Sequence, residues 1–201
     1  MVNRLKIGVI GFQGAVSEHI HIMRKTLEEE KIHGEVFTVK QTRDLKNINA
    51  LILPGGESTT ISKFLHRSGL YKEISSLVKK EGIPLMGTCA GCVLLAKEIS
   101  ADPAEEVKTL KFMDMKVKRN AFGRQRESFE KDIHITDFTK PFHAVFIRAP
   151  VIEKTWDGCK PMARLDNKIV MAQQGNILAL SFHPELTNDL RIHKYFLKLV
   201  K

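Results

Sequence analysis

Pro84-Leu-Met-Gly-Thr-Cys-Ala-Gly-Cys-Val-Leu-Leu95 passes from a short apolar run through a sharp turn into a helical pattern. It is the cysteine counterpart of the Gly-x-Ser-x-Gly elbow, in which a buried strand delivers a nucleophile onto a tight turn. Gly87 and Gly91 remove side chains that would collide at such a turn. The N–H groups and dipole of the following helix favour a thiolate over a thiol. The pattern therefore predicts that Cys89 is a nucleophile.

Other interpretations of this segment involve no nucleophile. A cysteine is often a small buried hydrophobic residue, although the two flanking glycines argue against that here. Cys89 and Cys92 form a C-x-x-C pair, which can be a thioredoxin-like redox centre. Cys92 is better explained as a packed residue one helical turn further on. A zinc site is disfavoured because Cys159 is the one other cysteine, so we predict no metal.

Length and composition fit one intracellular domain. The chain has 201 residues, enough for a substantial core. It contains no apolar run of membrane-spanning length and no signal-type N-terminal stretch. Three cysteines suit a reducing compartment better than a disulfide scaffold. We predict a single domain over residues 1–201, located in the cytoplasm and not associated with a membrane.

The formal net charge of +9 is concentrated in one stretch. Residues 108–126 contain four lysines and three arginines, with Asp114 as the one acid among them. Few aromatic residues lie among these charges, and no nucleic-acid-binding module is present. The stretch therefore favours a protein partner or a substrate over nucleic acid.

The first half of the chain alternates short apolar runs with amphipathic helical patterns. Parallel strands with helices on both faces are the usual result of this alternation. Right-handed crossovers would place the chain after Gly11, Leu53 and Met86 along one edge of the sheet. On the first helix, His19 and His21 are interpreted as surface or packing residues. The strands are expected at 6–11, 35–39, 50–53 and 84–86, and the helices at 15–31, 58–67 and 70–80.

After about residue 101 the pattern changes to short strands separated by turns. This indicates antiparallel strands added to the parallel sheet rather than a second domain. The predicted fold is α/β, with an open, mostly parallel sheet flanked by helices on both faces and additional antiparallel strands in the C-terminal half. The expected strands are 110–119, 129–135, 142–147, 162–165, 168–173 and 177–182, followed by a helix over 188–200.

Two further segments carry chemistry. Gly55 and Gly56 follow a buried strand, where ligands bind in open α/β sheets and where peptide N–H groups can stabilise an oxyanion. Ser58 is the expected N-cap of the helix that follows. His183 and Glu185 follow the last strand, and residues two apart in an extended chain project to the same side. Pro184 favours that extended state, so the pair could act as a general base and the group that orients it.

These segments together resemble the Cys-His-Glu triad of class I glutamine amidotransferases. Further matches narrow the resemblance to the glutaminase subunits of pyridoxal 5′-phosphate synthase, and they cover nearly the whole chain. These matches are Gln13-Gly-Ala15 with Glu18-His19, Pro54-Gly-Gly-Glu-Ser-Thr-Thr60, Arg119-Asn-Ala-Phe-Gly-Arg-Gln125, Phe146-Ile-Arg-Ala-Pro150 and Ser181-Phe-His-Pro-Glu-Leu-Thr187.

The resemblance implies hydrolysis of L-glutamine to L-glutamate and ammonia. Cys89 would attack the side-chain amide and form a γ-glutamyl thioester, His183 would transfer the proton, and Glu185 would hold the imidazole. Backbone N–H groups of Gly56 and Ala90 would form the oxyanion hole. The glutamine site would comprise Gly56, Glu57, Ser58, Arg119, Ile147 and Arg148.

The resemblance also implies a partner. Ammonia would pass to a synthase subunit that makes pyridoxal 5′-phosphate, within a large hetero-oligomer, while this chain binds no cofactor. We expect Gln13 and Gly55, at neighbouring strand ends, to take part in activation by that partner. The alternatives are a glutaminase that serves another synthase, a related cysteine hydrolase, and a binding module without activity.

Overall fold

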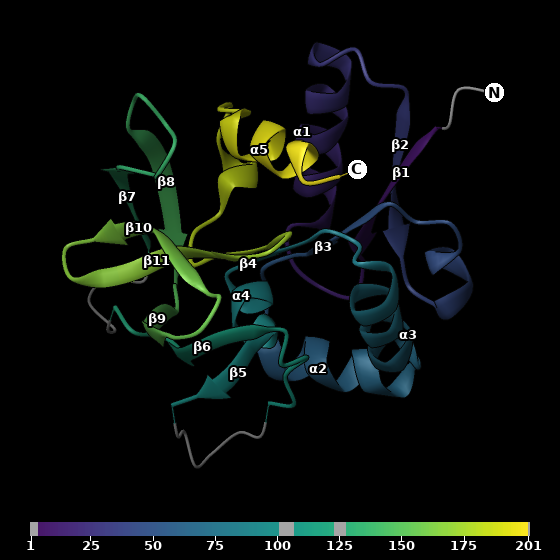
Figure 1. Ribbon diagram of the computed structural model, residues 1–201, viewed down its shortest axis with the longest axis horizontal. Coiled ribbons are helices and arrows are strands. Elements are labelled where there is room, and N and C mark those ends of the chain that lie inside the picture. The colour runs from purple at the N-terminus through teal and green to yellow at the C-terminus, as the bar shows by residue number, and fades with distance from the viewer. Residues whose placement is uncertain (1–3, 101–106, 123–127, 201) are drawn as a thin grey trace.

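The computed structural model describes residues 4–100, 107–122 and 128–200 (Figure 1). The expected polar connection over residues 102–106, the turn at Gly123 and the last part of the basic stretch lie outside these ranges. Within the described ranges, no helix is both long enough and apolar enough to cross a membrane.

The described residues form a ten-stranded sheet whose first part is parallel. The strand order β2-β1-β3-β4-β12 contains only parallel neighbours. The carboxyl ends of β1, β3 and β4 therefore meet at one edge, as the sequence predicts. These strands are β1 (Leu5–Ile10), β2 (Gly34–Val39), β3 (Ala50–Leu53), β4 (Leu85–Thr88) and β12 (Ile177–Leu180).

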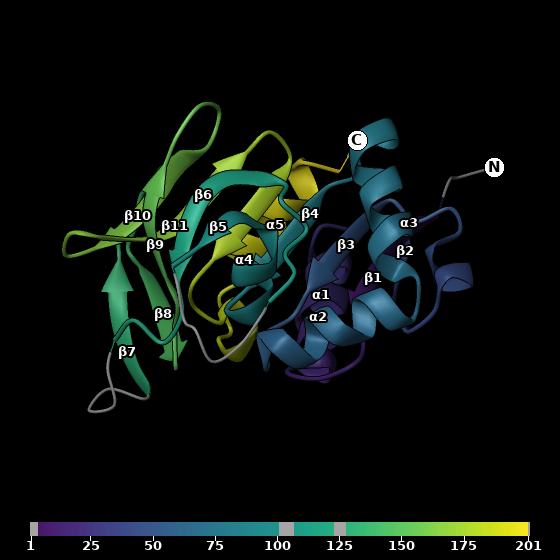
Figure 2. The ribbon, with the colours of Figure 1, turned by 90° about the horizontal axis from the view of Figure 1, so that it is seen from below.

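Helices cover both faces of this sheet (Figures 1 and 2). One face carries α1 (Val16–Glu29) and the C-terminal α5 (Arg191–Lys198). The other carries α2 (Ser58–Arg67), α3 (Leu70–Ser76) and α4 (Ala90–Leu95). The predicted third helix continues beyond α3 as one π-helical turn, Leu77–Glu81. Short 3-10 turns lie at Thr42–Leu45 and Pro184–Leu186.

The apolar runs of the strands supply two hydrophobic cores, one on each face. In β3, Leu51 and Leu53 pack toward α2, α3 and α4, whereas Ala50 and Ile52 pack toward α1 and α5. All four side chains are fully buried. Each large aliphatic side chain buried in this way contributes about 1.5–3 kcal/mol. A strand covered on both faces is therefore apolar at every position, which is why its sequence does not alternate.

The second half of the chain extends the sheet with mainly antiparallel strands, as predicted. β11 (Lys168–Gln174) runs antiparallel to β12, β10 (Lys160–Leu165) and β9 (Val151–Thr155). β6 (Met113–Lys118) pairs antiparallel with β9 and parallel with β5 (Ala96–Ile99). β7 (Ser128–Ile133) and β8 (Phe142–Ile147) were also expected to join this sheet, but they form a separate two-stranded hairpin, which corrects that expectation.

One further expectation, the pairing of the last strand, needs correction, and two strands were missed. The last strand is antiparallel to β11 but also pairs parallel with β4, so it belongs to the parallel core. β5 and β9 were not predicted. β5 was missed because the apolar pattern after the elbow continues through Ala96, and nothing in the sequence marks the end of α4. In the structure the backbone becomes extended at Ala96. In β9 only the first two residues are buried, which leaves no alternation to detect.

We expect Gly91→Ala to destabilise the fold. A Cβ at Gly91 would lie 2.1 Å from the carbonyl oxygen of Leu53, a backbone atom that cannot move aside. Overpacking of this kind costs about 1–3 kcal/mol, and we expect at least the upper end of that range. The measurement is the free energy of unfolding in urea.

Gly158→Ala is the matched control. A Cβ there would meet its nearest neighbour, the Gln174 side chain, at an ordinary 3.8 Å. It should change the unfolding free energy by no more than about 0.5 kcal/mol. Equal stabilities for the two variants would contradict the close approach at Gly91.

Candidate active site

Cys89 lies on the turn between β4 and α4, as the elbow pattern predicts. Its backbone has φ +50° and ψ −105°, a conformation that a residue with a side chain rarely adopts. A Cβ at Gly87 would lie 2.7 Å from the backbone of Gly91, so the turn can close because both positions are glycine. The thiol is buried and donates to the carbonyl of Ile147 at 3.6 Å. The fold thus stores strain at the candidate nucleophile.

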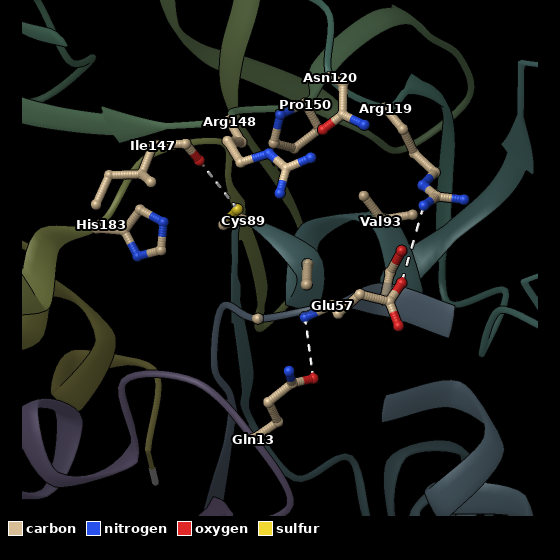
Figure 3. A pocket seen from close by; sticks show the side chains of 13 residues that line it. Gln13, Glu57, Cys89, Val93, Arg119, Asn120, Ile147, Arg148, Pro150 and His183 are labelled. Atoms are coloured by element: carbon tan, nitrogen blue, oxygen red, sulfur yellow. Dashed lines mark hydrogen bonds and ion pairs between the residues drawn. The ribbon is translucent and has the colours of Figure 1, made fainter. Parts of the chain in front are cut away.

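His183 and Glu185 stand beside this turn. The Nδ1 atom of His183 is 2.7 Å from Oε1 of Glu185, which leaves Nε2 for the Cys89 side. Figure 3 shows the His183 ring beside Cys89. The backbone N–H of His183 donates to the carbonyl of Val145 at 2.8 Å, which fixes the segment to β8. The predicted pairing is therefore present, but its geometric reason was wrong. Pro184–Leu186 is a 3-10 turn rather than an extended chain, and this turn folds the carboxylate back onto the imidazole.

The charge state of His183 is set by competing effects. Burial lowers its pKa, but hydrogen bonds with Cys89 and Glu185 outweigh burial and raise the pKa to about 10. Burial likewise raises the pKa of Glu185, yet His19 and His183 hold it below its usual value. The surroundings of His183 therefore favour its protonated imidazole, the form that is produced when a neighbouring thiol gives up its proton.

Two glycine-containing loops meet opposite Cys89. A Cβ at Gly14 would lie 1.6 Å from the carbonyl oxygen of Gly55, so the loop after β1 packs directly on the loop after β3. A Cβ at Gly55 would lie 2.5 Å from the His183 ring, so this glycine also makes room for the imidazole. Gln13 accepts a hydrogen bond from the backbone N–H of Glu57 at 3.2 Å. The backbone of Gly56 has φ +141°, a conformation that glycine adopts more readily than other residues.

A cavity of about 330 Å³ opens in front of Cys89 and His183 (Figure 3). Its wall includes every residue predicted for the glutamine site, together with Gln13 and Ala90. Ala90 is the first residue of α4, where a backbone N–H has no intrahelical acceptor. Glu185 lies behind His183 and does not line the cavity. The described residues that form the wall are Gln13, Gly56, Glu57, Ser58, Cys89, Ala90, Val93, Arg119, Asn120, Ile147, Arg148, Pro150 and His183.

Glu57 places a fixed negative charge on this wall. Its carboxylate accepts from the backbone N–H groups of Thr59 at 2.9 Å and Thr60 at 2.7 Å, and from both threonine hydroxyls. Burial opposes the charge, but these bonds lower the pKa of Glu57 to about 2. Glu57, not Ser58, is therefore the N-cap of α2, which corrects the sequence expectation. Ser58 is the first helical residue, and its side chain is buried.

Positive charge lies on the same cavity wall as Glu57. A guanidinium nitrogen of Arg119 is 3.9 Å from Glu57 Oε1, and Arg148 projects into the same space with a backbone φ of +44° (Figure 3). The wall therefore carries one carboxylate and two guanidinium groups. A free amino acid carries a carboxylate and an ammonium group on the same carbon atom, so its charges match such a wall.

Sequence reasoning did not assign a role to one polar residue behind the site. His19 was interpreted as a surface or packing residue; its ring is fully buried, which fits packing, and it also contacts Thr88 and Glu185. Its spacing from Val16 and Met23 on the apolar stripe of α1 could have indicated that it faces inward. Asn120, Pro150 and Val93 also line the cavity without having been predicted.

The redox interpretation of Cys89 and Cys92 has no support in the geometry. Cys92 is fully buried, and burial raises the pKa of its thiol. All three cysteines are free thiols. Among the described residues, no group of three or more His, Cys, Asp or Glu side chains could hold a metal ion.

The raised pKa of His183 predicts a pH-dependent contribution to stability. A histidine has a pKa near 6.5 when unfolded, so the protonated form is favoured by folding. The stabilisation is complete below about pH 6.5 and is lost as the pH rises to about 10. In urea unfolding, the stability difference between the wild type and His183→Gln should shrink steadily over this interval.

An exposed histidine, His21, provides the control for this measurement. His21→Gln, measured in the same way, shows what the loss of a histidine outside the site does to the free energy of unfolding. A constant or growing difference for His183→Gln would contradict the proposed ion-pair network.

Comparison with known proteins places this chain in a family. The chain matches the model of the SNO glutamine amidotransferase family over residues 9–201. It is 49% identical over 197 residues to a protein of Pyrococcus furiosus named pyridoxal 5′-phosphate synthase subunit PdxT, covering 98% of this chain and 99% of that protein. A protein of the same name from Methanosarcina mazei is 47% identical, covering 98% of both chains.

Solved structures agree with the sequence comparison. A crystal structure of a glutamine amidotransferase matches 96% of this chain and 98% of its own with a TM-score of 0.85 and 43% identity. A glutamine amidotransferase of Thermotoga maritima, at 14% identity and a TM-score of 0.64, shares the fold. With the family match spanning almost all of the sequence and the predicted residues around one cavity, the chain belongs to the SNO glutamine amidotransferase family.

Proposed function

We propose that this protein is the glutaminase subunit of a pyridoxal 5′-phosphate synthase. It hydrolyses L-glutamine to L-glutamate and ammonia, and it supplies the ammonia to a synthase subunit. The observation that carries the reaction is the strained Cys89 turn beside a His183–Glu185 pair 2.7 Å apart, at the wall of an amino-acid-sized cavity. The relatives named PdxT support the pathway.

The proposed reaction proceeds through a thioester. Cys89 gives its proton to Nε2 of His183, and the thiolate attacks the amide carbon of the glutamine side chain. The oxygen of that amide becomes an oxyanion, which the backbone N–H groups of Gly56 and Ala90 stabilise. As the tetrahedral intermediate collapses, His183 protonates the departing nitrogen and ammonia leaves. Water then attacks the γ-glutamyl thioester, gives a proton to His183, and releases glutamate and the Cys89 thiol.

The charges on the cavity wall orient the substrate in this proposal. Arg119 and Arg148 neutralise the α-carboxylate of glutamine, and the ionised Glu57 attracts its α-ammonium group. Gly56, Ser58 and Ile147 contribute the remaining wall. This orientation directs the side-chain amide toward Cys89.

The wider setting is also proposed. The whole chain acts as one glutaminase domain, supported by the return of β12 to the parallel sheet after the antiparallel strands. The three free thiols support a cytoplasmic location. With the synthase subunit the chain forms a large hetero-oligomer, which size-exclusion chromatography of the two mixed proteins would reveal.

The test is glutamate release from glutamine by the purified chain, with and without a pyridoxal 5′-phosphate synthase subunit. We expect strong stimulation by that subunit and complete loss of activity in Cys89→Ala, with an unchanged unfolding transition. Activity that ignores the subunit would indicate service to another synthase. Wild-type turnover by Cys89→Ala would refute the nucleophile, and inactivity of the wild type in both conditions would favour a binding module.

We further propose that Gln13 and Gly55 couple the partner to the oxyanion hole. Gln13 holds the N–H of Glu57, and Gly55 is packed against both Gly14 and His183. Gln13→Ala removes one hydrogen bond, worth about 1 kcal/mol, so the stimulation by the synthase subunit should fall about fivefold. The ratio of stimulated to unstimulated glutamate release measures this effect. An unchanged ratio would count against Gln13.

A further inference from the structure

A buried polar cluster lies behind the proposed triad. His19 on α1 and Thr88 at the end of β4 are both fully buried, and Glu185 is 5% exposed. The imidazole of His19 therefore lies in the protein interior, next to the carboxylate that orients the proposed base. The proposed reaction steps make no use of His19.

The distances define what His19 can do. Its Nε2 atom is 3.1 Å from Oγ1 of Thr88 and 3.4 Å from Oε1 of Glu185. The same carboxylate oxygen lies 2.7 Å from Nδ1 of His183. Within the described part of the chain, Nδ1 of His19 and Oε2 of Glu185 have no hydrogen-bond partner. A hydrogen on Nε2 faces two oxygens, whereas a lone pair there would face a carboxylate, so the Nε2–H tautomer fits the site.

We propose that His19 is a positioning residue that holds Glu185, and through it His183, in register with Cys89. This inference rests on the proposed glutaminase mechanism and adds a residue to it. Thr88 precedes Cys89 in the chain, so the contacts close a ring from Cys89 through Thr88, His19, Glu185 and His183 back to Cys89. The ring fixes the base relative to the nucleophile from two sides.

The physical need for His19 follows from the burial of Glu185. A buried carboxylate is costly unless donors satisfy it, and the described contacts of Glu185 are concentrated on one oxygen. Three titratable groups face the Glu185 carboxylate: His183 on the same segment, His19 on α1 and His193 on α5. Glu18, also on α1, favours the protonated form of His19. Burial, the largest effect, lowers the pKa of His19 and favours a neutral donor.

Loss of the His19 contact should therefore raise the pKa of Glu185. The carboxylate would then be protonated at a higher pH and would support His183 less well. The acid limb of any process that needs the Cys89 thiolate should move to higher pH. A loss of packing alone would not produce that shift.

The experiment follows alkylation of Cys89 by iodoacetamide as a function of pH, which requires neither glutamine nor a partner. In His19→Leu we expect the rate at neutral pH to fall about tenfold and the acid limb to move upward, because a polar contact with a buried carboxylate is lost. His19→Gln, whose amide nitrogen can reach the position of Nε2, should restore most of the rate. In glutamate release with the synthase subunit, His19→Leu should lower kcat with little change in KM.

His193→Leu is the matched control. His193 is also fully buried, and its ring centre lies 6.4 Å from that of His19, but neither ring nitrogen has a partner within the described residues. This variant should keep the wild-type alkylation profile. The same loss in His193→Leu and His19→Leu, or an unshifted profile in His19→Leu, would overturn the proposal.

Folding failure is also covered. If His19→Leu does not fold, His19→Phe keeps a planar ring without a donor and should show the same shift. If neither apolar variant folds, His19→Gln decides, because a folded His19→Gln that loses alkylation would refute the role. Normal alkylation profiles in a wild type that releases no glutamate would refute the proposed function and leave the alkylation test of His19 valid.

Discussion

The contact between Gly91 and the carbonyl of Leu53 is the constraint on which the rest of the site depends. Because a side chain at residue 91 would overlap that oxygen, α4 can approach the end of β3 as closely as two backbones allow. This approach sets the Cys89 turn beside Gly55 and Gly56, which leave β3 two residues later. The nucleophile and the oxyanion loop are therefore held together by backbone packing, and their relative position does not depend on flexible side chains.

Charge is arranged around this backbone frame in two layers. In the cavity, Glu57 faces Arg119 and Arg148, and each group is positioned by a helix start or a strand end. Behind the cavity, the Glu185 carboxylate is buried away from solvent, and neighbouring imidazole groups stabilise its charge. The outer layer suits recognition of a zwitterionic substrate, and the inner layer suits control of proton transfer.

Much of this arrangement could be predicted from the sequence, because strong local signals mark it. The elbow glycines, the Gly55-Gly56 pair and His183 with Glu185 each lie at the end of a buried apolar run, and a parallel sheet brings such ends together. What could not be predicted depends on contacts between distant segments. The parallel pairing of β12 with β4, the N-cap at Glu57 in place of Ser58, and the 3-10 turn after His183 all follow from tertiary packing. The burial of His19 had a weak helical signal that the charge of its neighbours obscured.

The first turn of α1 touches both halves of the proposed chemistry. Gln13 and Gly14, just before the helix, contact the oxyanion loop, and His19, just inside it, contacts the carboxylate behind the base. One rigid element therefore connects two groups that could otherwise change position independently. A shift of this helix would disturb oxyanion stabilisation and proton transfer together, so intermediate states with only one of them in place would be sparsely populated. Such a linkage would give the site two main states, one with both functions in place and one with neither. Little glutamine would then be hydrolysed by partly assembled sites.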